Sequence, residues 1–575
     1  MKQVQTALVL SLLFLGGNAP PAINPLVALS FNRYYDVEEM GEALAALEAA
    51  YPNLLSLGTM GQSREGRELW VMTVNNPETG DASTKPAMYI DANTHGNEIQ
   101  GGEVALFTIN YLVTKFGQDP WVTDLLNRFS FYIAPTVNPD SRHRFFHEAN
   151  NPHSPRQNQR PHDNDGDGSV DEDGPEDLNG DGEITMMRRI DPLGSMVLGE
   201  DPRTMRGRRP GEEGGWKTWW TEGIDNDGDG RINEDGPGGV DLNRQFPWEW
   251  SPDHRQHGAG PYMLSEPETR STANFVRNHP NIAAVQSYHN AGDMILRPPG
   301  AESTSSMGMP RSDLRVMDGI AERSKAFLPD YEYLEVFGGL YPVHGGFFDW
   351  TYGALGIISF TNELYAFNPD YDDDGVSSQE ERMRWNDEVA HGACFSDWEE
   401  FEHPDLGWIE IGGWRAFCTR APLPDELPEM AMRNTLFTLL HASFMPQVAL
   451  GKTTATRLER GLWQVEVEIL NLGEMPTASG QARRVGIAKE ERLTVLGGEL
   501  VASGERELDS RGGGTFVTNP HETPIEGEAQ VGNLGPMARR WIVLLVRASR
   551  GDALVIVLDS EKGGSATQEI QLPRR

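Results

Sequence analysis

Apolar runs alternate with amphipathic stretches through the first three quarters of the chain. Residues 37–51 carry Met40, Leu44 and Leu47 at helical spacing, and a second helix is predicted at residues 102–116. Short apolar runs predict buried strands at residues 69–74, 87–92, 129–134, 283–287 and 357–360. Strands that alternate with helices predict an α/β fold with a mixed sheet flanked by helices.

The pattern changes after Pro446. Residues 462–470 (LWQVEVEIL) alternate apolar and polar side chains, as do residues 541–546 and 553–558, and turn residues separate these runs. Alternation with a period of two is typical of half-buried strands. Residues 446–575 are therefore predicted to form an all-β sandwich domain.

Residues 150–239 interrupt the α/β pattern. They are rich in Asp, Gly, Asn and Arg and show little apolar periodicity. This segment is an insertion, and the sequence allows it to be either ordered or flexible.

The first 22 residues are typical of a signal peptide. Lys2 is followed by an apolar run at residues 7–15 and by small residues and prolines up to residue 22. We therefore expect an exported protein, either periplasmic or extracellular; a buried N-terminal helix is the alternative. No later apolar stretch is long enough to span a membrane.

The net charge limits the classes of binding partner, and the cysteine content limits the possible disulfides. The chain has 86 acidic and 49 basic residues and a formal net charge of −37, which disfavours nucleic acid and anionic membranes and favours cation binding. The two cysteines, Cys394 and Cys418, either form one disulfide or remain separate buried thiols.

Polar side chains follow several predicted strands. His95 and Glu98 come after one strand, His289 after another and Glu363 after a third. The carboxyl ends of strands are where open α/β sheets bind ligands. A catalytic zinc ion takes three protein ligands and leaves a position for water, so His95, Glu98 and His289 are the predicted zinc ligands.

These residues resemble the metal-binding motif of the zinc carboxypeptidases, the family of pancreatic carboxypeptidase A. The resemblance extends to residues 240–244 (VDLNR), 341–352 (YPVHGGFFDWTY) and 359–364 (SFTNEL), in the family's order. It covers about residues 31–440 and implies a catalytic domain at 31–443 with the insertion at 150–239.

The resemblance also implies a role for individual residues. Glu363 corresponds to the catalytic glutamate, which acts as general base, and Tyr341 to the mobile active-site tyrosine. Asn243 and Arg244 correspond to the residues that hold the substrate's terminal carboxylate. Asp241 corresponds to the carboxylate that orients a ligand histidine.

Two further assignments follow from the family pattern. The arginine that stabilises the oxyanion is expected after the Asn138-Pro139-Asp140 motif, and we assign it to Arg188, with Arg189 and Arg144 as alternatives. Phe348 takes the pocket position that is acidic in enzymes preferring Lys or Arg, which favours apolar terminal residues.

Four acidic loops share the pattern Asp-x-Asp/Asn-x-Asp-Gly. Alternating oxygen ligands around a glycine turn suit calcium, although a single such loop is often only a solvated turn. Glu381 stands at the twelfth position of the last loop, as in an EF-hand loop. The candidate calcium ligands are Asp163, Asp165, Asp167, Asp177, Asn179, Asp181, Asp225, Asp227, Asp229, Asp370, Asp372, Asp374 and Glu381.

The sequence thus predicts a zinc-dependent carboxypeptidase that acts on peptide or protein C-termini and has structural calcium loops. A zinc hydrolase of cell-wall or γ-glutamyl peptides, or an amidohydrolase of the aspartoacylase type, is the nearest alternative. A calcium-dependent binding protein on an inactive peptidase fold is another. The sequence does not indicate an oligomeric state.

Overall fold

The computed structural model describes residues 26–164, 166–508, 514–517 and 527–574. The predicted signal peptide, residues 1–22, lies outside this part of the chain, as does Asp165. Within these ranges, no helix combines the length and the apolar character that crossing a membrane requires.

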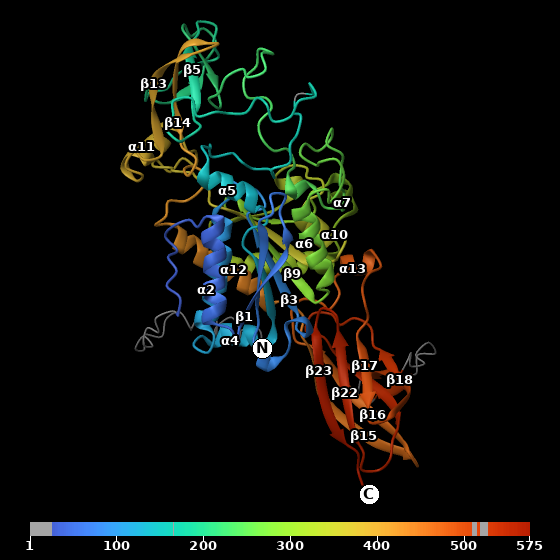
Figure 1. Ribbon diagram of the computed structural model, residues 1–575. Coiled ribbons are helices and arrows are strands. Elements are labelled where there is room, and N and C mark those ends of the chain that lie inside the picture. Colours follow the sequence, from blue (N-terminus) through green and yellow to red (C-terminus); the bar gives the residue numbers. More distant parts are fainter. Residues whose placement is uncertain (1–25, 165, 509–513, 518–526, 575) are drawn as a thin grey trace.

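An eight-stranded mixed sheet forms the centre of the larger part of the molecule (Figure 1). Its strand order is β1-β2-β4-β3-β9-β12-β10-β11, and the inner strands β4, β3, β9 and β12 are parallel. This confirms the predicted mixed sheet. The strands are β1 Leu55–Gln62, β2 Glu68–Val74, β3 Ala87–Ala92, β4 Ser130–Ala134, β9 Ile282–Asn290, β10 Met294–Arg297, β11 Glu332–Glu335 and β12 Ile358–Leu364.

Helices cover both faces of this sheet because successive strand residues point to opposite sides. Met88 and Ile90 of β3 pack into one core cluster with α2, α3, α4, α8 and α12, whereas Tyr89 packs into another with α6 and α10. The helices are α2 Val37–Ala50, α3 Gln100–Lys115, α4 Pro120–Arg128, α5 Pro139–His147, α6 Pro267–Asn278, α7 Glu302–Met307, α8 Arg311–Ser324, α9 Val336–Gly339, α10 Phe347–Gly353, α11 Gln379–Glu388 and α12 Leu427–Ser443.

The acidic insertion contributes to an ordered antiparallel sheet at the top of Figure 1. Four of its strands lie within residues 186–219, and two come from residues 395–414, so segments far apart in the sequence pair here. The strand order is β13-β14-β5-β8-β6-β7. The strands are β5 Met186–Ile190, β6 Met196–Leu198, β7 Met205–Gly207, β8 Trp216–Trp219, β13 Phe395–His403 and β14 Gly407–Trp414.

Cys394 and Cys418 form a disulfide. The bond joins the residue before β13 to a residue shortly after β14, and therefore closes the hairpin at its base. Of the two alternatives that the sequence allowed, the structure shows the paired one.

The C-terminal part consists of two sheets with a shared apolar core. Trp463 and Val465 of one sheet pack in the same cluster as Leu493 and Ile556 of the other. Their alternating burial is the pattern on which the sandwich prediction depended. The elements are α13 Gly480–Arg484, β15 Val448–Glu459, β16 Leu462–Asn471, β17 Arg492–Leu496, β18 Glu499–Leu508, β19 Gly514–Val517, β20 Glu528–Gln530, β21 Arg539–Arg547, β22 Ala553–Ser560 and β23 Gly564–Gln571.

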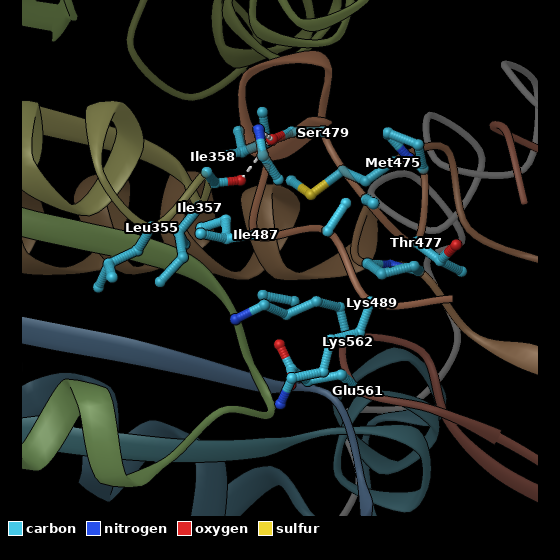
Figure 2. A pocket seen from close by; sticks show the side chains of 17 residues that line it. Leu355, Ile357, Ile358, Met475, Thr477, Ser479, Ile487, Lys489, Glu561 and Lys562 are labelled. Atoms are coloured by element: carbon cyan, nitrogen blue, oxygen red, sulfur yellow. Dashed lines mark hydrogen bonds and ion pairs between the residues drawn. The ribbon is translucent and has the colours of Figure 1, made fainter. Parts of the chain in front are cut away.

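The sandwich contacts the edge of the central sheet where the parallel strands begin. Figure 2 shows a small cavity at this junction, where the Ser479 hydroxyl donates a hydrogen bond to the Gly356 carbonyl at 2.7 Å. Lys562 donates to the carbonyl of Ile282, the first residue of β9, at 2.7 Å. The C-terminal part therefore lies away from the carboxyl ends of these strands.

A buried ion pair joins α3 to α5. Arg142 has no exposed surface, and its guanidinium contacts Glu103 at 2.7 Å and donates to the carbonyls of Tyr35 and Ile99. Removing one member of a buried pair leaves the other charge uncompensated. The pair therefore makes the position of α5 depend on α3, the helix that follows the predicted zinc ligands His95 and Glu98.

Replacing Glu103 tests this pair. We expect Glu103→Leu to lower the free energy of unfolding by about 3–5 kcal/mol, because the Arg142 charge stays buried without a partner. The matched control is Glu388→Leu, which removes an exposed pair with Arg384 and should cost less than about 1 kcal/mol. The measurement is urea unfolding followed by circular dichroism. Equal losses in the two variants would contradict a special contribution from the buried pair.

Candidate active site

The parallel strands bring the predicted metal ligands to one edge of the central sheet. His95 and Glu98 follow the end of β3, and His289 lies at the end of β9. Glu363 lies near the end of β12, directly opposite His289 in the strand pairing. Three segments that are distant in the sequence therefore converge because their strands run in the same direction.

The loop that carries His95 and Glu98 is held tightly. The Asn93 side-chain amide donates to the carbonyls of His95 at 2.8 Å and Gly96 at 3.1 Å. A Cβ atom at Gly96 would lie only 2.3 Å from the Cβ of Ser141 and 2.6 Å from the Pro155 carbonyl oxygen. Glycine is therefore required between the two ligand positions.

The three candidate ligands have the spacing that a tetrahedral metal site needs. The Nδ1 atoms of His95 and His289 are 3.2 Å apart, and they lie 2.9 and 3.0 Å from the two carboxylate oxygens of Glu98. Ligand atoms about 2.0–2.1 Å from a zinc ion in tetrahedral geometry lie about 3.3 Å apart. All three side chains are buried, so this donor set fits a single zinc ion.

Asp241 supports the site from behind His95. Its Oδ1 atom lies 3.0 Å from His95 Nε2, which leaves Nδ1 directed at the other ligands. Burial favours the neutral acid, but the interactions with His95, Arg244 and Arg156 lower the pKa of Asp241 well below its usual range. Asp241 is therefore a carboxylate that fixes the ring of His95.

The pKa values of the two central glutamates shift in opposite directions. Burial opposes ionisation of Glu98, yet the adjacent His95 and His289 lower the pKa of Glu98 well below its usual range. Withdrawal from bulk water raises the pKa of Glu363 to about 7, and the negative charge of Glu98 adds to this effect. Such a separation suits one ligand carboxylate and one carboxyl group that exchanges a proton.

Asn243 and Arg244 lie on η3, residues Leu242–Arg244, directly after Asp241. The side-chain oxygen of Asn243 accepts a hydrogen bond from the backbone N–H of Phe347 at 2.8 Å. Its side-chain nitrogen lies 3.4 Å from His289 Nε2. Arg244 donates to the Asn243 backbone carbonyl at 2.9 Å. Both side chains are buried at the wall of the same cavity.

This cavity also contains Tyr341 and Phe348. Tyr341 is 48% exposed, whereas Phe348 is buried in an apolar cluster with Leu296, Val336 and Val343. The structure thus brings the predicted ligands, Glu363, Asn243, Arg244, Tyr341 and Phe348 to one cavity. None of the described residues that line it comes from the C-terminal sandwich.

The assignment of Arg188 is wrong. Arg188 lies on β5, donates to Glu410 at 2.6 Å and stacks over the Trp398 ring, with 4.0 Å from the guanidinium carbon to the ring centre. The alternatives fail as well, because Arg189 donates to the Leu406 carbonyl and Arg144 pairs with acidic side chains outside the cavity. The strand pairing of the insertion directs Arg188 into a different sheet.

Two other arginines, Arg156 and Arg420, line the cavity, and neither was predicted from the sequence. Arg156 contacts Glu98 Oε1 at 3.1 Å and Asp241 Oδ2 at 3.3 Å. Arg420 donates to the Asn290 carbonyl at 2.8 Å and lies 3.9 Å from Glu98. Arg156 lies between the Asn138 motif and the first acidic loop, which is where the family pattern places an arginine, so the sequence contained a signal for it. No sequence pattern singles out Arg420.

The acidic loops fold alike. In each loop the carboxylate of the first aspartate accepts a hydrogen bond from the backbone N–H of at least one following glycine; Asp225, for example, accepts from Gly228 and Gly230. The carboxylate oxygens of Asp225, Asp227 and Asp229 lie within 4.8 Å of one another. Glu381 folds back to accept from the Tyr371 and Ser378 backbones.

Comparison with known proteins agrees with this geometry. A family model described as zinc carboxypeptidase matches residues 40–179 and 209–370, which is more than half of the chain. A domain of unknown function matches residues 447–571. Arg188 lies between the two matched segments of the first model, and Arg420 lies after both.

Individual relatives are more distant. Carboxypeptidase A2 of Rattus norvegicus is 25% identical over 341 residues, or 58% of this chain and 63% of that protein. Carboxypeptidase D of Homo sapiens is 32% identical over 118 residues, or 20% of this chain and 9% of that protein. The chain thus spans less than two thirds of the length of either relative.

A similarity to solved structures is also found. The crystal structure of thrombin activatable fibrinolysis inhibitor aligns with 74% of this chain and 77% of its own, at 17% identity and a TM-score of 0.43. The extent of the family match, rather than this similarity, decides the assignment. The chain belongs to the zinc carboxypeptidase family.

Proposed function

We propose that this protein is a metallocarboxypeptidase that removes single residues from the C-termini of peptides or proteins. The observation that carries the proposal is one cavity lined by three candidate metal ligands, a buried carboxyl group with a raised pKa and a buried arginine. Residues 31–443 form the catalytic domain, and residues 446–575 form an accessory β-sandwich in this proposal.

His95, Glu98 and His289 would hold one zinc ion. Zinc, when bound, supplies a Lewis acid that polarises the scissile carbonyl and makes water more acidic. Asp241 keeps Nδ1 of His95 free for the metal by accepting a hydrogen bond from the Nε2–H group of the ring.

Glu363 moves the proton in this mechanism. As a carboxylate it takes a proton from the attacking water, and as a carboxylic acid it delivers that proton to the leaving amine. Because burial raises its pKa, this carboxyl group exchanges a proton closer to neutral pH than an exposed glutamate does. Arg156 points a guanidinium toward the metal ligands, where it would stabilise the oxyanion that develops on the carbonyl.

Asn243, Arg244 and the cavity wall select the end of the chain. The guanidinium of Arg244 can bind the terminal carboxylate in a bidentate manner, and Asn243 can donate beside it. Phe348 and its apolar neighbours favour an apolar terminal side chain. Tyr341, which is half exposed, can close over the bound peptide.

Arg420 favours a second class of substrate. It adds a guanidinium near Glu98, on the metal side of the cavity, in addition to Arg156 and Arg244. A substrate with a further carboxylate, such as a γ-glutamyl or cell-wall peptide, would use this charge. Export to the periplasm or the extracellular space places the enzyme near such peptides, and calcium there would be available to the acidic loops as a structural ion.

Peptide digestion tests the proposed activity. Zinc-loaded protein is expected to shorten free peptides one C-terminal residue at a time, and to leave the same peptides intact when their C-termini are amidated, because Arg244 then has no carboxylate to bind. Glu363→Gln should lower kcat by about 10²–10⁴-fold at unchanged zinc content. Mass spectrometry measures the products.

The alternatives give different products in this experiment. Cleavage of γ-glutamyl or cell-wall peptides alone would move the assignment to the second substrate class. Intact substrates of all classes, with zinc bound, would contradict the enzymatic proposal and favour a binding protein.

The acidity of Glu363 predicts the pH profile. The pKa of Glu363 is raised to about 7 in the absence of a cation, and a bound metal ion would lower it from that value. Because only the carboxylate accepts the proton from water, kcat/KM should fall as the pH drops through the acid range below 7. Glu363→Asp should shift this acid limb, whereas Phe348→Leu should leave it in place. If the acid limb of the kcat/KM profile stays at the same pH in Glu363→Asp, the titrating group is not Glu363.

A further inference from the structure

Two of the acidic loops are copies of each other. Residues 163–175 (DNDGDGSVDEDGP) and 225–237 (DNDGDGRINEDGP) differ only at three central positions. The other two acidic loops do not continue this pattern beyond the glycine. We call residues 163–175 the first repeat and residues 225–237 the second repeat.

The two repeats pair with each other in the fold. Asp173 and Asp235 occupy the same position in their repeats, and their backbones exchange hydrogen bonds of 3.0 and 3.3 Å. The side chains follow the same reciprocal pattern: Asp235 accepts from the Asp171 backbone at 3.1 Å, and Asp173 accepts from the Asn233 backbone at 3.3 Å. The repeats are thus related by an approximate two-fold arrangement.

Carboxylate oxygens without a hydrogen-bond donor are buried between the repeats. Asp173 has no exposed surface, and its Oδ2 atom has no partner. This side chain offers an oxygen within 4.8 Å of carboxylate oxygens of Asp227 and Glu234 from the second repeat. Both oxygens of Glu234 are buried and unpartnered as well. A carboxylate set of this kind is costly unless a cation compensates it.

A second carboxylate cluster also contains side chains from both repeats, here two from the first repeat and one from the second. Asp167 and Glu172 of the first repeat lie within 4.8 Å of Asp227 of the second. Withdrawal from water raises the pKa of Glu234 to about 7, and the charges of Asp173, Asp229 and Asp227 add to the effect. This is the electrostatic strain that a bound divalent ion relieves, and all-oxygen ligands suit calcium.

The repeats flank two segments of the active site. Asn158, between Arg156 and the first repeat, donates its backbone N–H to the Val240 carbonyl at 2.9 Å. Val240 follows the second repeat and directly precedes Asp241. The pairing of the repeats therefore continues into the pairing of the segments that carry Arg156 and Asp241.

We propose that the two repeats form one composite calcium site, in which Asp173 of the first repeat completes the coordination by Asp227 and Glu234 of the second. Binding joins the repeats and thereby holds the Arg156 and Asp241–Arg244 segments side by side. This deepens the proposal that the acidic loops bind calcium, since it makes two of them a single cooperative unit.

Hydrogen exchange measured by mass spectrometry tests this site on the full, zinc-loaded chain. Added CaCl₂ should slow exchange by about tenfold or more in both repeats and in residues 240–246. Asp227→Asn should abolish the calcium effect in both repeats, because its carboxylate belongs to both clusters. Asp227 is exposed, and its hydrogen bond from the Asp229 backbone can be retained by asparagine, so the variant should fold.

The control is Asp372→Asn, the same change in the unpaired loop at residues 370–381, where Asp372 likewise accepts from the backbone two residues later. It should leave the calcium effect in both repeats intact. If Asp227→Asn abolished the calcium-dependent slowing of exchange in the second repeat alone, the two repeats would bind calcium independently. That result would overturn the composite site. No calcium effect in the unmodified protein would also overturn it. Exchange does not depend on peptide hydrolysis, so this outcome is independent of the proposed activity.

Discussion

The parallel pairing of β3, β9 and β12 is the constraint on which the active site depends. It places His289 and Glu363 opposite each other and brings the His95 loop to the same edge of the sheet. A shift of one residue in this register would turn His289 or Glu363 to the other face. The apolar clusters on both faces fix the register, so the packing of the core determines the geometry of the candidate metal ligands.

The other two parts of the molecule leave open the edge of the central sheet that carries the candidate metal ligands. The sandwich is attached where the parallel strands begin, and the second sheet rises from the insertion near the opposite end (Figure 1). The insertion nevertheless contributes to the site, because Arg156, Asp241 and Arg244 lie on the segments that enter and leave it. Arg420 lies two residues after Cys418, whose disulfide with Cys394 closes the β13–β14 hairpin.

Local patterns in the sequence predicted the central strands, the three side chains that converge as candidate metal ligands, and the sandwich strands, because these depend on periodicity and on short motifs. They did not predict that residues 186–188 pair with residues 410–412, since no local signal specifies a partner more than two hundred residues away. The expectation that Arg188 lies at the active-site cavity was wrong for the same reason. Arg142, Arg144, Arg156 and Arg160 all follow the Asn138 motif, and only tertiary contacts separate them: Arg142 is buried against Glu103, Arg160 pairs with Glu266, and Arg156 reaches the metal ligands.

The central claim is that His95, Glu98 and His289 together hold one zinc ion. Anomalous X-ray diffraction at the zinc absorption edge, on crystals of the zinc-loaded protein, tests it most directly. The account predicts a peak about 2.0–2.2 Å from Nδ1 of His95, Nδ1 of His289 and the Glu98 carboxylate. A zinc peak elsewhere, with this cluster empty at full zinc occupancy of the protein, would contradict it.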